Sequence, residues 1–424
     1  MEDLTREPIS VYIHIPFCVR KCAYCDFPSF AGEGARMEGY VQAVCREMRA
    51  QAAFFGRRKV ATVFLGGGTP TLLKGEQAGA LLGCLRESFD LLPGAEITLE
   101  GNPGTLTREK LAAYRAAGVN RLSLGVQSFD DTLLQSIGRI HTAEEAEQAA
   151  RMAREAGFEN LNLDLMLGLP GQTPRMWEET LARAIDLKPA HLSCYSLILE
   201  EGTPLRAQAI AGQCAPLPDE DALDAMDGIT DRLTSAAGFA RYEVSNYARE
   251  GFECRHNLVY WECKPYLGLG LAAHSDMDGR RFANAPNWAD YAKQADGLLA
   301  REPEGDGSIA ERRFERMMMG LRMVRGVDVS RFERDFGAAP EAVWPRSIAR
   351  LEADGLMERC GERLRLTRRG MQVMNAALVL LLEEQDALEP AAACGGNGQA
   401  ECGESQGANA IRDYASSPER QSGR

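Results

Sequence analysis

Short runs of β-branched and other apolar residues recur along the first half of the chain, and a longer amphipathic stretch follows most of them. We predict strands at 11–15, 61–65, 96–100, 121–125, 160–167 and 191–197, and helices between them at 37–53, 76–89, 143–156 and 176–186. Strands that alternate with helices are typical of parallel βαβ units. Six units fall short of a closed eight-stranded barrel, so the pattern predicts an α/β fold, a partial (β/α)6 barrel with its site in loops at the carboxyl ends of the strands.

The pattern changes at about residue 309. Three helical periods and a strand-like segment follow between 311 and 367, in an order that resembles a winged-helix module. From about residue 391 the chain is rich in Gly, Ala, Ser and Gln, a composition that buries too little apolar surface to fold. The sequence therefore predicts a partial barrel at 1–240, a connecting segment at 241–308, a winged-helix-like C-terminal domain at 309–385 and a disordered tail at 386–424.

Composition limits the class of protein. The 424 residues contain 48 Lys and Arg against 61 Asp and Glu, and a net charge of −13 disfavours broad contact with nucleic-acid phosphates. The segment 311–370 is the exception, with 14 Lys and Arg against 10 Asp and Glu, which leaves a nucleic-acid reader as a minor hypothesis. No apolar run approaches the ~18 residues that a membrane span needs, and the first residues do not resemble a secretion signal, so we expect a cytoplasmic protein.

Three of the twelve cysteines stand together, in Cys18-Val-Arg-Lys-Cys22-Ala-Tyr-Cys25 just after the first predicted strand. In a reducing compartment a tight cysteine group binds metal or does chemistry more often than it forms disulfides. A structural zinc takes four ligands, whereas three thiolates suit an iron–sulfur cluster with one iron left open. Zinc completed by Asp26, or plain packing of the three side chains, is the alternative.

Polar residues also follow the later predicted strands. The turn Gly66-Gly67-Gly68-Thr69 allows positive φ and successive N–H groups that form an anion-binding concavity, although such a turn is often no more than a turn. Glu100 and Asp164 are acids in otherwise apolar strands, where an unpaired charge is costly. A ribose hydroxyl pair, or an internal ion pair such as Asp164 with Arg139, would satisfy them.

The string Tyr12-Ile-His-Ile-Pro-Phe-Cys18-x-x-x-Cys22-x-Tyr24-Cys25 resembles the signature of radical S-adenosylmethionine (SAM) proteins. Within them the chain, from about 11 to 376, is similar to the branch that holds the oxygen-independent coproporphyrinogen III dehydrogenases and the HemW-type heme chaperones. The resemblance implies a [4Fe–4S] cluster on Cys18, Cys22 and Cys25, with SAM on the fourth iron. It places one or two SAM molecules among Tyr12, Tyr24, Gly67, Gly68, Thr69, Glu100, Gln127, Arg139 and Asp164.

Two features separate the members of that branch. The dehydrogenases have a further cysteine two residues after the third, where this chain has Phe27, and His256-Asn-Leu-Val-Tyr-Trp resembles the His-Asn-x-x-Tyr-Trp string of the chaperones. The resemblance therefore implies a chaperone that binds heme and delivers it to recipient proteins; the alternative is the dehydrogenase itself. A homodimer is a separate hypothesis, on which the sequence is silent. His256 is a candidate heme ligand, with Cys254 as a rival and a hydrogen-bonded structural histidine as the plain alternative.

Overall fold

The computed structural model describes residues 7–305 and 307–388, which form two compact units. The first unit contains residues 7–241, 245–259 and 264–303, and the second contains residues 242–244, 260–263, 304–305 and 307–388. Most of the predicted tail, from residue 389, lies outside the described residues, whereas 386–388 are helical. No helix in the described part of the chain is long and apolar enough to cross a membrane.

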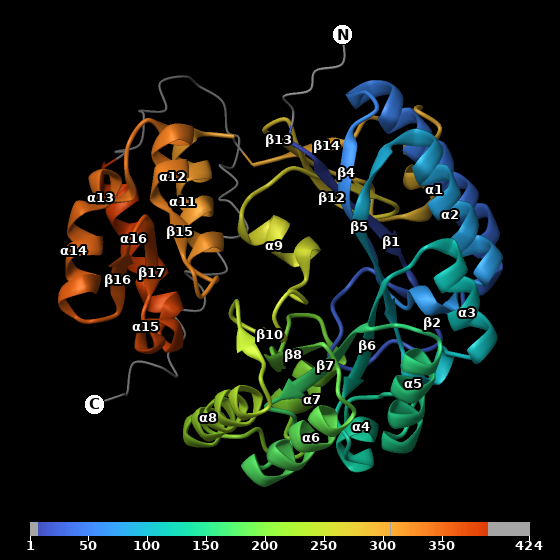
Figure 1. Cartoon of the computed structure of the whole chain (residues 1–424), viewed down its shortest axis with the longest axis horizontal. Helices are drawn as coiled ribbons and strands as arrows, with labels where there is room; N and C mark the ends of the chain where they lie inside the picture. The colour runs from blue at the N-terminus through green and yellow to red at the C-terminus, as the bar shows by residue number, and fades with distance from the viewer. Residues whose placement is uncertain (1–6, 306, 389–424) are drawn as a thin grey trace. The chain divides into compact units, whose positions relative to one another are not determined.

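Six adjacent parallel strands form the centre of the first unit, and they confirm the six predicted ones. They are β1 (Ile9–Ile15), β4 (Lys59–Gly67), β5 (Asp90–Gly101), β6 (Arg121–Gln127), β7 (Asn160–Leu167) and β8 (His191–Ser196), in this spatial order. The helices between them are α1 (Met37–Phe55), α2 (Gly75–Ser88), α3 (Arg108–Ala117), α4 (Asp131–Ser136), α5 (Ala143–Glu155) and α6 (Pro174–Asp186), with α7 (Pro204–Ile210) and α8 (Glu220–Ala236) after β8. Figure 1 shows these helices along the outside of the curved strands, from α1 in blue to α6 in green.

Local sequence explains these elements. Strand positions such as Ile13, Leu99 and Leu163 are fully buried, because they belong to the apolar core between the sheet and the helices that cover it. Helices α3 and α5 each begin after a threonine, Thr107 or Thr142, whose side chain accepts a hydrogen bond from the third helical N–H, a cap worth about 1 kcal/mol.

The sheet extends beyond the six predicted strands at both edges. Strand β11 (Tyr266–Leu269) pairs parallel with β1, and β12 (His274–Met277) and β13 (Arg280–Ala283) follow antiparallel. At the other edge β10 (Asn246–Ala248) pairs antiparallel with β8, and β9 (Ala240–Arg241) pairs antiparallel with β10. The same segment contains α9 (Arg255–Trp261), α10 (Trp288–Ala295) and β14 (Glu302–Glu304). The sequence stretch predicted as a connecting segment therefore supplies strands to the same sheet.

The second unit contains helices and a small antiparallel sheet, as predicted for the C-terminal module. Its helices are α11 (Ile309–Gly320), α12 (Val329–Phe336), α13 (Pro340–Val343), α14 (Pro345–Ala353), α15 (Arg368–Gln372) and α16 (Met374–Leu388). Strands β15 (Val327–Asp328), β17 (Arg363–Leu366) and β16 (Met357–Cys360) lie in that order. Phe332, Trp344 and Leu364 are fully buried in its own apolar core.

Candidate functional site

A cavity of about 420 Å³ opens at the carboxyl ends of the parallel strands. Eleven of the residues predicted from the sequence line it: Cys18, Cys22, Tyr24, Cys25, Gly67, Gly68, Thr69, Glu100, Gln127, Arg139 and Asp164. They come from loops or strand ends far apart in the chain, so the fold gathers them as the barrel pattern predicts. The other two predicted residues, Tyr12 and His256, are not among the residues that line this cavity.

The three-cysteine loop leaves β1 and is fixed at both ends. The two-residue strands β2 (Phe17–Cys18) and β3 (Phe30–Ala31) pair parallel and close the loop. All three cysteines are half-buried, and burial raises the pKa of the Cys25 thiol. Across residues 7–305 and 307–388, no three Cys, His, Asp or Glu side chains are placed as ligands of a single metal ion.

Hydrogen-bond donors face two of the cysteine sulfurs. The Thr69 hydroxyl lies 3.7 Å from Cys18 Sγ, and Nη1 of Arg139 lies 3.5 Å from Cys22 Sγ. Donors of this kind stabilise thiolates and tune the potential of the iron–sulfur cluster that thiolates hold. The residues present therefore fit a [4Fe–4S] cluster held by three cysteines.

The glycine turn after β4 holds the cysteine loop in place. The backbone N–H of Gly68 donates to the carbonyl of Ile15 over 2.9 Å, and the N–H of Thr69 donates to that of Phe17 over 2.7 Å. A Cβ on Gly68 would lie 2.7 Å from the Phe17 carbonyl oxygen, so no larger residue fits without movement of the backbone. Since the N–H of Gly67 donates to Glu100, all three N–H groups have partners inside the protein. The prediction that these N–H groups form an anion-binding concavity is therefore wrong, because two of them hold the cysteine loop and the third binds Glu100.

Two carboxyl groups face the cavity from neighbouring parts of the barrel. Glu100, at the end of β5, accepts a 3.1 Å hydrogen bond from Gly67, and Asp164 accepts bonds from Asn162 Nδ2 over 2.7 Å and Ser123 Oγ over 3.1 Å. Burial, and then the nearby Asp164 charge, raises the pKa of Glu100 to about 8. Burial likewise raises the pKa of Asp164. These groups resist ionisation in the cavity and can bind hydroxyl groups such as those of a ribose.

Arg121 is a cation that acts on both carboxyls. Arg121 is buried at the start of β6, and its charge opposes the rise in the pKa of Glu100 and of Asp164. Arg139 instead donates to Cys22 Sγ and to the carbonyl of Gly125. The ion pair between Asp164 and Arg139, considered as the plain alternative from the sequence, is not among the contacts of the described residues.

Two features of the cavity wall are characteristic of a ligand site. Gln127 has a φ of 67°, where a non-glycine residue is strained, and its side chain accepts a 2.7 Å hydrogen bond from the Tyr195 hydroxyl. Nε of Arg139 is buried and has no hydrogen-bond partner among the described residues. A buried donor that costs free energy when unpaired fits a wall that a polar ligand such as SAM completes.

The remaining predicted residues lie against the strands. Tyr12 Oη is 3.0 Å from His14 Nδ1, and its ring stacks on Phe64. His256 is 1% exposed: its Nδ1 lies 2.7 Å from Thr62 Oγ1, and its ring stacks on Phe64 with centroids 5.1 Å apart. Burial, then the Arg121 charge, lowers the pKa of His256 to about 3, so the imidazole is neutral.

The backbone around His256 is fixed by a buried acid that the sequence analysis missed. The carboxylate of Glu96, near the start of the buried part of β5, accepts hydrogen bonds from the N–H groups of Arg255 and His256 over 3.2 and 3.1 Å, and Cys254 Sγ lies 3.6 Å away. The first turn of α9 is thus anchored to the sheet. A sequence signal existed, since Glu96 is an acid in a strand pattern, as Glu100 is.

Comparison with known proteins follows the same division of the chain. The pattern of the Radical SAM superfamily matches residues 12–184, and that of the HemN C-terminal domain matches residues 308–373. The heme chaperone HemW of Escherichia coli strain K12 is 37% identical over 382 residues, which make up 89% of this chain and 99% of the relative. The heme chaperone HemW of Bacillus subtilis strain 168 is 36% identical over 88% of this chain and 99% of the relative.

A solved structure gives the same fold. Coproporphyrinogen III oxidase (HemN) from Escherichia coli, described as a radical SAM enzyme, superposes with a TM-score of 0.77 and 25% sequence identity. The superposition covers 88% of this chain and 90% of that one. The chain therefore has relatives over nearly its whole described length.

Proposed function

Because the chain belongs to the family of the heme chaperones named HemW, within the radical SAM superfamily, we propose that it is a heme chaperone that binds heme and delivers it to recipient proteins. The observation that carries the proposal is Phe27, which lines the cavity and is 60% exposed. The dehydrogenase pattern has a cysteine at this position, and phenylalanine offers an apolar face in its place.

The cysteine loop would hold the [4Fe–4S] cluster through Cys18, Cys22 and Cys25. One or two SAM molecules would bind beside it, with the carboxyls of Glu100 and Asp164 toward hydroxyl groups and the unpaired Nε of Arg139 toward an acceptor. Cluster and SAM together supply reductive radical chemistry when they are bound. The residues of this chain bind and orient the two groups and limit the access of water to them.

The remaining properties are extensions of this proposal. We propose that the protein works in the cytoplasm, exchanges heme with recipient proteins and has no nucleic-acid partner. Its net charge of −13 supports the last point. A homodimer is the proposed assembly, which light scattering of the cluster-loaded protein tests directly.

Anaerobic reconstitution with iron and sulfide, followed by titration with hemin, tests the function. We expect saturable binding of one heme per chain and transfer of that heme to an apo-hemoprotein. The same preparation, supplied with SAM, a reductant and coproporphyrinogen III, tests the dehydrogenase alternative that the similarity to HemN keeps open. Turnover of coproporphyrinogen without heme binding would overturn the chaperone proposal.

A further inference from the structure

Large apolar side chains are exposed at the mouth of the cysteine cavity. Phe27, two residues after Cys25, is 60% exposed, and Ile198, in the loop after β8, is 67% exposed; both line the cavity. Val19, beside Cys18, is 56% exposed. Exposed apolar side chains that gather at a cavity mark a binding surface, because leaving them in water costs free energy.

The same rim carries charge of both signs. Arg20 and Lys21 are exposed and line the cavity, and Lys21 Nζ donates to the carbonyl of Phe27 over 3.1 Å, which holds the ammonium beside that residue. Two acids from loops, Asp26 and Glu200, also line the cavity. The two cations are adjacent in the chain and add positive charge to the cysteine-loop side of the cavity, where Phe27 also lies.

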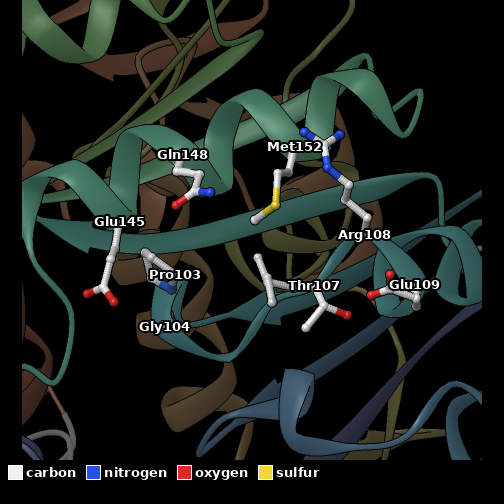
Figure 2. Close-up of a pocket in the computed structure, with 9 residues that line it drawn as sticks. Pro103, Gly104, Thr107, Arg108, Glu109, Glu145, Gln148 and Met152 are labelled. Atoms are coloured by element: carbon white, nitrogen blue, oxygen red, sulfur yellow. The ribbon is translucent and has the colours of Figure 1, made fainter.

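A second cavity differs from the cysteine cavity in how its charged side chains are paired. A depression of about 360 Å³ lies between α3 and α5 and is lined by Arg108, Glu109, Glu145, Gln148 and other residues. Figure 2 shows these side chains around it. Arg108 pairs with Glu155, and Glu145 caps α5, so two of its three charged side chains already have partners in the fold.

Resting on the proposed function, we propose that heme docks at the mouth of the cysteine cavity, with one face of the macrocycle on Phe27 and Ile198 and its propionates toward Arg20 and Lys21. A porphyrin is a planar apolar ring with two carboxylates at one edge, which matches exposed apolar side chains beside two cations. The polar floor below, with Glu100 and Asp164, suits SAM and leaves the mouth to the cargo. The motif histidine, His256, is 1% exposed and cannot reach a macrocycle unless α9 leaves the sheet.

The test is an anaerobic hemin titration of cluster-loaded protein, with SAM present, followed by absorbance. Phe27→Ser and Ile198→Ser each remove one apolar contact, and we expect each to weaken hemin binding at least about tenfold. Phe54→Ser and Leu298→Ser are matched controls, since these side chains are 75% and 78% exposed and do not line the cavity. Iron content and SAM binding of each variant show whether the cluster site is intact. If Phe27→Ser loses the cluster, Ile198→Ser still tests the docking site, because Ile198 lies outside the cysteine loop.

The outcomes separate this inference from the function on which it rests. Weaker binding in both rim variants, with both controls unchanged, supports the docking site. Unchanged binding in the rim variants, with a wild-type protein that binds hemin, overturns the site and leaves the chaperone function standing. A wild-type protein that binds no hemin overturns the proposed function, and this inference with it.

The two cations have their own test. The double variant Arg20→Gln with Lys21→Gln should weaken hemin binding about tenfold and leave the binding of hemin dimethyl ester unchanged, because the ester lacks the propionate charges. Equal affinity of wild type and variant for hemin would overturn the placement of the propionates.

Discussion

Replacement of Glu100 by glutamine should stabilise the empty protein at neutral and alkaline pH. The pKa of this carboxyl is raised from its ordinary value of 4.5 to about 8, chiefly by burial. Between these two values the unfolded chain has released the proton and the folded chain keeps it, so the free energy of unfolding of the wild type falls by about 1.4 kcal/mol per pH unit. The stability that the wild type has with a neutral Glu100 is fully present below pH 4.5 and is lost once the pH has risen through about 8.

The magnitude follows from the same shift. The wild type loses about 3 kcal/mol of its free energy of unfolding by pH 7 and about 5 kcal/mol above pH 8, and the Glu100→Gln variant does not, because its amide cannot ionise. Urea unfolding of the cluster-free protein in reducing buffer, at intervals from pH 5 to pH 9, measures the difference between variant and wild type. We expect this difference to rise with pH and then level off.

Glu96→Gln provides the matched control. This carboxylate lies four residues earlier in β5 but accepts hydrogen bonds from the backbone N–H groups of Arg255 and His256. Its replacement by an amide removes charge-assisted bonds, so it should destabilise the protein by about 2–3 kcal/mol at neutral pH. A difference between Glu100→Gln and wild type that does not change with pH, or a Glu100→Gln protein less stable than wild type at pH 9, would refute the reasoning.

Three further substitutions test other parts of the fold. Cys22→Ser should abolish the [4Fe–4S] cluster, measured as iron and sulfide content after reconstitution, whereas Cys360→Ser, at an exposed cysteine, should leave it unchanged. Gly68→Ala should weaken SAM binding at least about tenfold in equilibrium dialysis, because the new Cβ meets the carbonyls of Ile15 and Phe17. The control Gly79→Ala, in α2 with open space around it, should raise the free energy of unfolding by up to about 1 kcal/mol. His256→Ala should lower the free energy of unfolding by about 2–4 kcal/mol and leave the absorption spectrum of bound heme unchanged. A shifted heme spectrum in a well-folded variant would show instead that His256 is a heme ligand.

Much of the barrel could be predicted because its signals are local. Each parallel strand is a short apolar run, and the rule that a site forms at the carboxyl ends of such strands brings Glu100, Gln127 and Asp164 to one cavity. The inward-facing polar residues also had a signal that went unused: alternation along β6 and β7 places Arg121 and Ser123 on the face of Asp164. This alternation of side chains along β6 predicts that Arg121 points to the inner face of the sheet, where Asp164 lies.

Other features depend on contacts that no local pattern encodes. The glycine turn was expected to bind an anion, but the carbonyls that accept from Gly68 and Thr69 belong to Ile15 at the end of β1 and Phe17 in β2, far earlier in the chain. The strand β11 was missed because four residues are too few to show a strand pattern in the sequence. They form a strand because they pair with β1, which lies far away in the chain. The burial of His256 likewise follows from its place on β4 and β5, not from the motif around it.

The cavity at the strand ends is also volume that the folded chain leaves unpacked. A ligand that enters it binds the folded protein and not the unfolded one, so each tenfold rise in free SAM above its Kd adds about 1.4 kcal/mol to the free energy of unfolding. In a cell, the fraction of chains open to proteases falls by the same factor of about ten. The abundance of the protein is therefore expected to follow the supply of SAM, so that the chain is retained when SAM is plentiful and cleared when it is scarce.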